Sequence, residues 1–145
     1  NTGEERKDLR YQPLSALVTC NAGDRVLLRF VNLGFTQVAM RLTGIKMRIV
    51  GRDAMPLVGR DGTDLTFMTS TAPVGAGETA DAIFVAPPFN ASQAVIDATG
   101  TYNRYLLYNR ALTHMDGGSG TLAGGQMTEI RVFDGNLGPQ ADFNQ

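Results

Sequence analysis

Apolar and polar residues alternate along much of this chain with the period of two that is typical of half-buried β-strands. In one segment, Val26, Leu28 and Phe30 fall on the same side of an extended backbone. Arg25 and Arg29 fall on the opposite side. This pattern predicts a strand with one face on a core and the other toward solvent.

Eight segments have such a strand pattern, and turn-forming residues separate them. The predicted strands are residues 14–20, 25–31, 38–42, 46–50, 65–71, 79–85, 102–108 and 127–133. Predicted turns lie at 21–24, 43–44 and 73–77, residues 52–64 read as a loop or short hairpin, and only 91–98 fits a short helix. Short strands at near-regular spacing predict an all-β sandwich or barrel.

The length predicts one domain. A chain of 145 residues can bury a sizeable core, about two-thirds of its unfolded surface. We expect the domain to cover residues 13–134, with polar linkers or tails at 1–12 and 135–145. The chain does not begin with Met and shows no signal-peptide pattern, so we expect a mature secreted product or a piece of a longer sequence.

Composition excludes several classes of partner. A hydrophobic content of 43% and a charged content of 19% are those of an ordinary globular domain. A net charge of −1 gives no electrostatic footprint for nucleic acid or an anionic membrane. No apolar run reaches the ~18 residues needed to span a bilayer. We therefore expect neither a nucleic-acid nor a membrane partner.

Metal ligands are scarce, because the sequence has one histidine, His114, and one cysteine, Cys20. A blue-copper centre needs two imidazoles and a thiolate, and a structural zinc site needs several His or Cys ligands. Cys20 fits a buried apolar position better than a reactive thiol, since no basic residue is near it in sequence. The His114–Met115 pair is either a weak copper-loading site or, as we favour, an ordinary loop.

Other candidate sites have simpler structural explanations. The six methionines are dispersed, which favours core filling over copper handling; they are Met40, Met47, Met55, Met68, Met115 and Met127. The glycine-rich stretch 117–125 lacks the lysine of a phosphate-binding loop. Five carboxylates could form a hydrolytic pair or a Ca²⁺ site; they are Asp53, Asp61, Asp64, Glu78 and Asp81. Turn contexts explain Asp61 and Glu78 without chemistry. Asn90-Ala91-Ser92 is a formal glycosylation sequon.

Five segments in order resemble one family. They are 21–32 (NAGDRVLLRFVN), 42–53 with Leu42-Thr43-Gly44, 74–85 (VGAGETADAIFV), 100–108 with Gly100-Thr101-Tyr102, and 124–133 beginning Gly124-Gly125-Gln126-Met127. Together these segments resemble a cupredoxin-like domain of a bacterial multicopper oxidase. The resemblance implies a Greek-key β-sandwich.

The chain departs from that family at the copper ligands. Ile45 follows Gly44 where the family often has His, and residues 108–113 contain neither His nor Cys. No catalytic, cofactor-binding or metal-binding residue can be carried over, so we expect no copper in this segment. The resemblance then implies the copper-free middle domain of a three-domain enzyme, with sister cupredoxin domains as partners and copper in the parent. That parent would be a periplasmic or extracellular oxidoreductase that oxidises phenols or metal ions and reduces dioxygen.

Two other functions stay open. A stand-alone β-sandwich could bind carbohydrate or a protein partner, but sugar platforms usually present exposed aromatic rings. This chain has no Trp, and Tyr102, Tyr105 and Tyr108 do not share one strand face. A small independent enzyme is less favoured, because the sequence has no Gly-x-Ser-x-Gly motif to accompany its single histidine.

Overall fold

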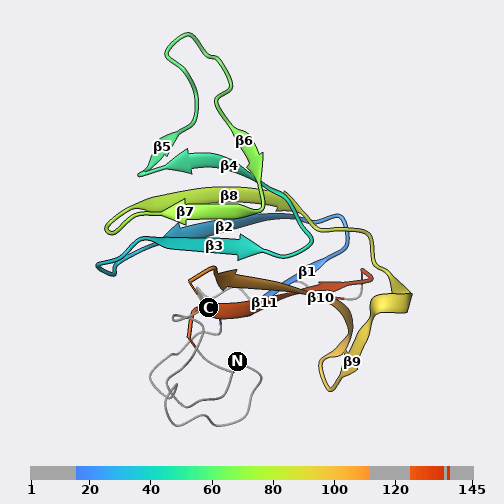
Figure 1. The fold of residues 1–145 in the computed structure, drawn as a ribbon. Coiled ribbons are helices and arrows are strands. Elements are labelled where there is room, and N and C mark those ends of the chain that lie inside the picture. Colours follow the sequence, from blue (N-terminus) through green and yellow to red (C-terminus); the bar gives the residue numbers. More distant parts are fainter. Residues whose placement is uncertain (1–15, 112–124, 136, 138–145) are drawn as a thin grey trace, which may run out of the picture.

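Two β-sheets face each other in the computed structural model, which describes residues 16–111, 125–135 and 137 (Figure 1). In this part of the chain, the larger sheet, sheet A, has six strands, and sheet B has five. The strands of sheet A are β1 (Val18–Asn21), β3 (Val38–Leu42), β7 (Thr71–Val74), β9 (Val95–Asp97), β10 (Gly100–Asn109) and β11 (Met127–Phe133). The strands of sheet B are β2 (Arg25–Val31), β4 (Met47–Arg52), β5 (Met55–Pro56), β6 (Phe67–Thr69) and β8 (Thr79–Val85).

Sheet A runs in the order β1-β11-β10-β3-β7, with β9 added to β10, and sheet B in the order β2-β8-β4-β5, with β6 added to β4. β1 pairs parallel to β11, and each other strand pair is antiparallel. The helical content of the described residues is a single 3₁₀ turn, η2 (Ala91–Gln93). None of their helices is long and apolar enough to cross a membrane. The predicted all-β sandwich is confirmed.

The core lies between the two sheets. Its largest fully buried apolar side chains come from both sheets; they are Leu42, Met47, Ile49, Val74, Phe84, Ile130 and Val132. On β2 the predicted alternation is confirmed, since Leu28 is buried and Val26 and Phe30 pack against the core, whereas Arg25 and Arg29 are exposed. Each large apolar side chain that is fully buried stabilises the fold by about 1.5–3 kcal/mol. Packing of the two sheets is therefore the main stabilising contact.

Several predicted bounds are confirmed, and one predicted strand is wrong. β2, β3, β8 and β11 have the predicted bounds. Residues 65–71 do not form one strand, because the chain leaves sheet B after β6 and enters sheet A at β7. A period of two cannot reveal such a crossing, because it indicates extended backbone on both sides of Ser70 but not the sheet that each part joins.

The predicted turn at 73–77 begins two residues too early. Pro73 lies inside β7, where it pairs with Ala39. β7 is an edge strand, so one of its sides has no neighbouring strand. The N–H that proline lacks removes no ladder hydrogen bond on that side. The turn itself follows at Gly75–Gly77, where the Glu78 side chain accepts a hydrogen bond from the Gly75 N–H at 2.7 Å.

The predicted helix at 91–98 is also wrong. Only the 3₁₀ turn η2 forms there, with the Asn90 side chain accepting from the Ser92 N–H at 3.0 Å. The chain then continues as β9, which makes a hairpin with β10. The β-branched pair Val95-Ile96 and the turn formers after it favour this hairpin. Residues 1–12, predicted as a tail, lie outside the described part of the chain.

Replacing Leu42 with Ala should destabilise the domain by about 2–5 kcal/mol, because the side chain is fully buried and a cavity remains. Urea unfolding followed by circular dichroism measures this change. The matched control is Leu27→Ala on the outer face of β2, where the side chain is 48% exposed, and its effect should stay within about 0.5 kcal/mol. Equal losses in the two variants would contradict the assigned core.

Candidate functional site

Cys20 occupies the buried position predicted for it. It lies on β1 with 3% of its surface exposed, and its thiol contacts the Arg131 carbonyl with an Sγ–O distance of 3.9 Å. Burial, with a smaller contribution from the charge of Asp24, raises the pKa of Cys20 to about 11. The thiol is therefore protonated at neutral pH and is a poor nucleophile or metal ligand.

The other soft donors are spread over the fold. Met47 is fully buried, and Met40 packs against the same core, so core filling explains both. Met55 and Met68 are exposed on sheet B. Met127 begins β11 and is partly exposed. His114 and Met115 lie outside the described residues, as does most of the stretch 117–125.

The five candidate carboxylates serve turns and ion pairs. Asp61 and Asp64 each accept a backbone N–H two residues ahead, at 3.0 and 2.8 Å. Hydrogen bonds from the side chains of Thr63 and Thr66, and then from their backbone N–H groups, lower the pKa of Asp61 and Asp64. Asp53 accepts from the Thr79 N–H at 2.8 Å, and Asp81 pairs with Arg29 at 3.5 Å. In the described residues, no three His, Cys, Asp or Glu side chains come together as a metal site.

The three tyrosines do not form an exposed platform. Tyr102 is buried with 2% of its surface exposed, and Tyr105 packs against the core between the sheets. Tyr108 is half-buried and lies on the opposite face of β10 from Tyr105. These three rings therefore do not form a flat row on one face of β10.

A polar cluster that the sequence did not indicate lies on the face of sheet A away from the core. At its centre the Arg131 side chain is only 3% exposed. Its guanidinium pairs with Glu129 at 3.1 Å and with Asp97 at 3.3 Å, and donates to the Thr99 hydroxyl at 2.9 Å. The guanidinium carbon also lies 4.4 Å from the centroid of the Tyr102 ring. Side chains from β9, from the turn after it, from β10 and from β11 therefore surround one buried positive charge.

Hydrogen bonds define the electrostatics of this cluster. Asp97 accepts from the Thr99 side chain and backbone and from the Tyr102 hydroxyl. These bonds, with Arg131 adding a smaller contribution, lower the pKa of Asp97 to about 2. Burial and the hydrogen bond to Asp97 raise the pKa of Tyr102. Every charge has a partner, so the cluster fastens the β9 hairpin to β10 and β11 and leaves no free acid or base for catalysis.

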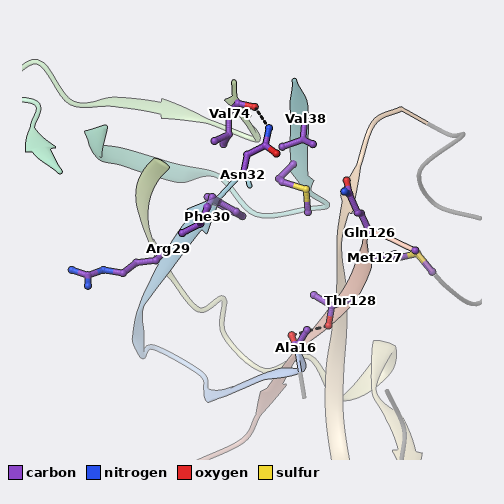
Figure 2. A pocket seen from close by; sticks show the side chains of 12 residues that line it. Ala16, Arg29, Phe30, Asn32, Val38, Val74, Gln126, Met127 and Thr128 are labelled. Atoms are coloured by element: carbon purple, nitrogen blue, oxygen red, sulfur yellow. Dashed lines mark hydrogen bonds between the residues drawn. The ribbon is translucent and has the colours of Figure 1, made fainter. Parts of the chain in front are cut away.

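A pocket of about 350 Å³ opens between the sheets, at the side where β2 approaches β3 and the start of β11 (Figure 2). Phe30, Val38, Met40 and Val74 give it an apolar lining. Arg29 belongs to the rim, and its side chain extends away from the pocket (Figure 2). The lining residues offer apolar surface to a ligand or to a partner's side chain.

The polar side chains around the pocket are already engaged. Gln126 accepts from Asn109 at 2.7 Å, and the Thr128 hydroxyl donates to the Ala16 carbonyl at 2.8 Å. Asn32 donates to the carbonyls of Thr36 and Val74 at 2.8 and 3.1 Å. The described polar side chains of the lining thus have partners within the fold.

Sequence reasoning missed both the cluster and the pocket. Arg131 alternates with Ile130 and Val132, which correctly places it on the other face of β11 but gives no sign that Tyr102 and Asp97 cover it. The pocket depends on the separation of two sheets, which strand patterns do not encode. The nearest signal of the pocket in the sequence was Asn32, a polar residue directly after the predicted strand 25–31.

Solved multicopper oxidases share this fold. A blue copper oxidase from Nitrosomonas europaea superposes with a TM-score of 0.63 at 22% identity, covering 83% of this chain. The multicopper oxidase mgLAC gives 0.57 at 20% identity over 90% of this chain. The McoA multicopper oxidase from Aquifex aeolicus gives 0.55 at 21% identity over 83%. This chain thus has the cupredoxin-like fold of one multicopper oxidase domain.

The same matches cover only part of the solved proteins. The chain spans 31% of the Nitrosomonas protein, 34% of mgLAC and 22% of the Aquifex protein. No protein-family model matches this chain, and no curated protein matches it either. The structural likeness therefore concerns the fold of a domain, not the activity of a whole enzyme.

Replacing Arg131 with Met should destabilise the isolated domain by about 1.5–3 kcal/mol, because it removes charged hydrogen bonds from a buried group. Arg104→Met is a matched control. Arg104 pairs with the same Glu129 at 3.5 Å, but its side chain is 51% exposed, so its loss should cost less than about 1 kcal/mol. Equal effects in urea unfolding would show that the buried cluster does not fasten the hairpin.

Acid should weaken the same cluster. The pKa of Asp97 is depressed to about 2 from 3.8, so its ionised form stabilises the fold fully above about pH 4. That stabilisation is lost as the pH falls toward 2, because the folded state then takes up the proton less readily than the unfolded state. Thermal unfolding from pH 5 to pH 2 should show a smaller pH dependence in Asp97→Asn than in the wild type. An identical pH dependence in both would contradict the assignment.

Proposed function

We propose that this chain is a copper-free structural domain of a multicopper oxidase. The observation that carries the proposal is the match in fold over 83% of this chain to a blue copper oxidase of which it spans 31%. A domain of this kind would bury part of its surface against sister domains and hold them at a fixed separation. Catalysis would take place in those neighbours.

The donor set between the sheets supports the copper-free part of the proposal. Ile45, at the position where the family often has histidine, is 6% exposed and packs in the core. Cys20 and Met47 share that core, but the described residues contain no imidazole to join them. A thiol with a pKa near 11 and a thioether do not make the His₂Cys set of a blue-copper centre.

The middle position in a three-domain parent is the finer part of this proposal. The parent would couple oxidation of a phenol or a metal ion to the reduction of dioxygen, and it would work in the periplasm or outside the cell. These statements rest on the family resemblance, since a fold alone does not fix an activity. They predict His-x-His and His-Cys-His blocks in the reading frame on either side of this segment.

Copper binding tests the proposal directly. We expect the isolated 145-residue chain, dialysed against Cu(II), to show no intense blue absorption and no tight stoichiometric uptake. The full-length protein encoded by the same gene should hold several coppers and show that absorption. His114→Ala in the isolated chain serves as the control for weak surface binding.

Three results would contradict the proposal. The isolated chain could bind one copper tightly and turn blue, which would make it a copper domain in its own right. The gene could encode these residues alone, which would leave no sister domains. The full-length protein could lack copper-ligand blocks and bind no copper, which would show that it is not a multicopper oxidase.

A further inference from the structure

The loop between β2 and β3 exposes two large apolar side chains to solvent. Leu33 is 87% exposed and Phe35 is fully exposed, at 102%. Val31, just before the loop, is 60% exposed. Single exposed apolar residues are common on protein surfaces, but a contiguous group indicates an interaction site.

Asn32 gives this loop a defined shape. Its side chain is buried, donates to the carbonyls of Thr36 and Val74, and accepts from the Gly34 N–H at 3.0 Å. The loop is therefore tied at its base to β7. A loop that is already held in one shape loses less conformational entropy on binding than a free one. Binding through Leu33 and Phe35 would therefore have a small entropy cost.

The apolar pocket lies directly beside this loop. Val31, Asn32 and Val38, which flank or begin the loop, all line the pocket, and Figure 2 shows Asn32 and Val38 there. Since the polar side chains of the lining are engaged in hydrogen bonds, the apolar surface left free comes mainly from the partly buried Phe30, Val38 and Met40. Two protruding apolar residues and an adjacent apolar recess make one surface, which we name the loop–pocket face: residues 30–38 with Met40.

We propose that the loop–pocket face is the surface on which a sister domain of the parent oxidase docks. This inference rests on the proposed function. Its partner would offer an apolar side chain to the pocket and an apolar recess or flat patch to Phe35. Anchors of this kind, seated in a pocket near the centre of an interface, supply most of the binding energy of protein contacts.

The course of the chain favours a sister domain over a separate protein. Ala16, the first described residue, lines the pocket. A sister domain would belong to the same polypeptide and would therefore be tethered to this domain. Tethering gives an effective concentration near the millimolar range. The chain spans only 31–34% of two matched oxidases. Most of each of those proteins therefore lies outside the match and is long enough to include such a neighbour.

Other exposed apolar residues provide a control surface. Met55 on β5 is 69% exposed, and Figure 1 places β5 on the far side of sheet B from β3 and β11. A change there removes a similar amount of exposed apolar surface without touching the loop–pocket face. Met55→Ser is therefore matched to the double variant Leu33→Ser/Phe35→Ser.

Hydrogen–deuterium exchange of the loop–pocket face tests the inference. In the full-length wild type, backbone amides of residues 33–37 should exchange at least about tenfold more slowly than in the isolated 145-residue chain. The double variant should lose this difference, and Met55→Ser should keep it. In the isolated chain, both variants should unfold at the wild-type temperature, because the altered side chains are exposed.

The outcomes separate the inference from the proposed function. Copper content and blue absorption of the same full-length preparation report on the proposed function alone. A copper-loaded full-length protein whose loop exchanges as fast as in the isolated chain would overturn the inference and leave the function standing. A dimer of the isolated chain in sedimentation, abolished by the double variant, would assign the face to a second copy and also overturn it.

Discussion

Burial of apolar side chains between two sheets is the interaction on which this domain depends. Leu42, Phe84, Ile130 and Val132 fill the space from opposite sides, and with so few metal ligands and no disulfide the fold has nothing else of comparable strength. Cys20 belongs to the same core as a protonated thiol. In the described residues the interior between the sheets is therefore mainly apolar. This property connects the fold to the structural role that we propose.

Buried polar side chains hold the loops around that apolar core in place. Asn32, Asn103 and Asn109 are each buried, and each binds backbone or side-chain groups of a loop. Arg131 does the same for the β9 hairpin on the outer face of sheet A. Because a buried polar group without a partner is costly, these contacts favour one loop arrangement over others. The loop–pocket face inherits its shape from Asn32, so the surface proposed for docking follows from the hydrogen bonding of one side chain.

Much of the fold could be predicted from the sequence, because strands with one buried face carry a period of two. The bounds of β2 and β11 follow directly from residues such as Val26, Leu28, Ile130 and Val132. The crossing from β6 to β7 could not be predicted, since an extended pattern does not indicate which sheet a strand joins. The burial of Arg131 and the pocket beside Phe30 depend on tertiary contacts, which local patterns do not contain. The loop–pocket face was therefore missed, although the scarcity of metal ligands was plain from the composition.

A domain that positions copper-bearing neighbours without binding copper would have an apolar interior, fixed loops and an apolar docking surface. The described part of this chain has an apolar interior and loops held by buried asparagines, and it exposes the apolar face that we propose for docking. Anomalous diffraction at the copper absorption edge, from crystals of the full-length protein, tests the central claim most directly. We expect every copper peak to lie on ligands outside this domain. A copper peak coordinated entirely by side chains of this domain would contradict the claim.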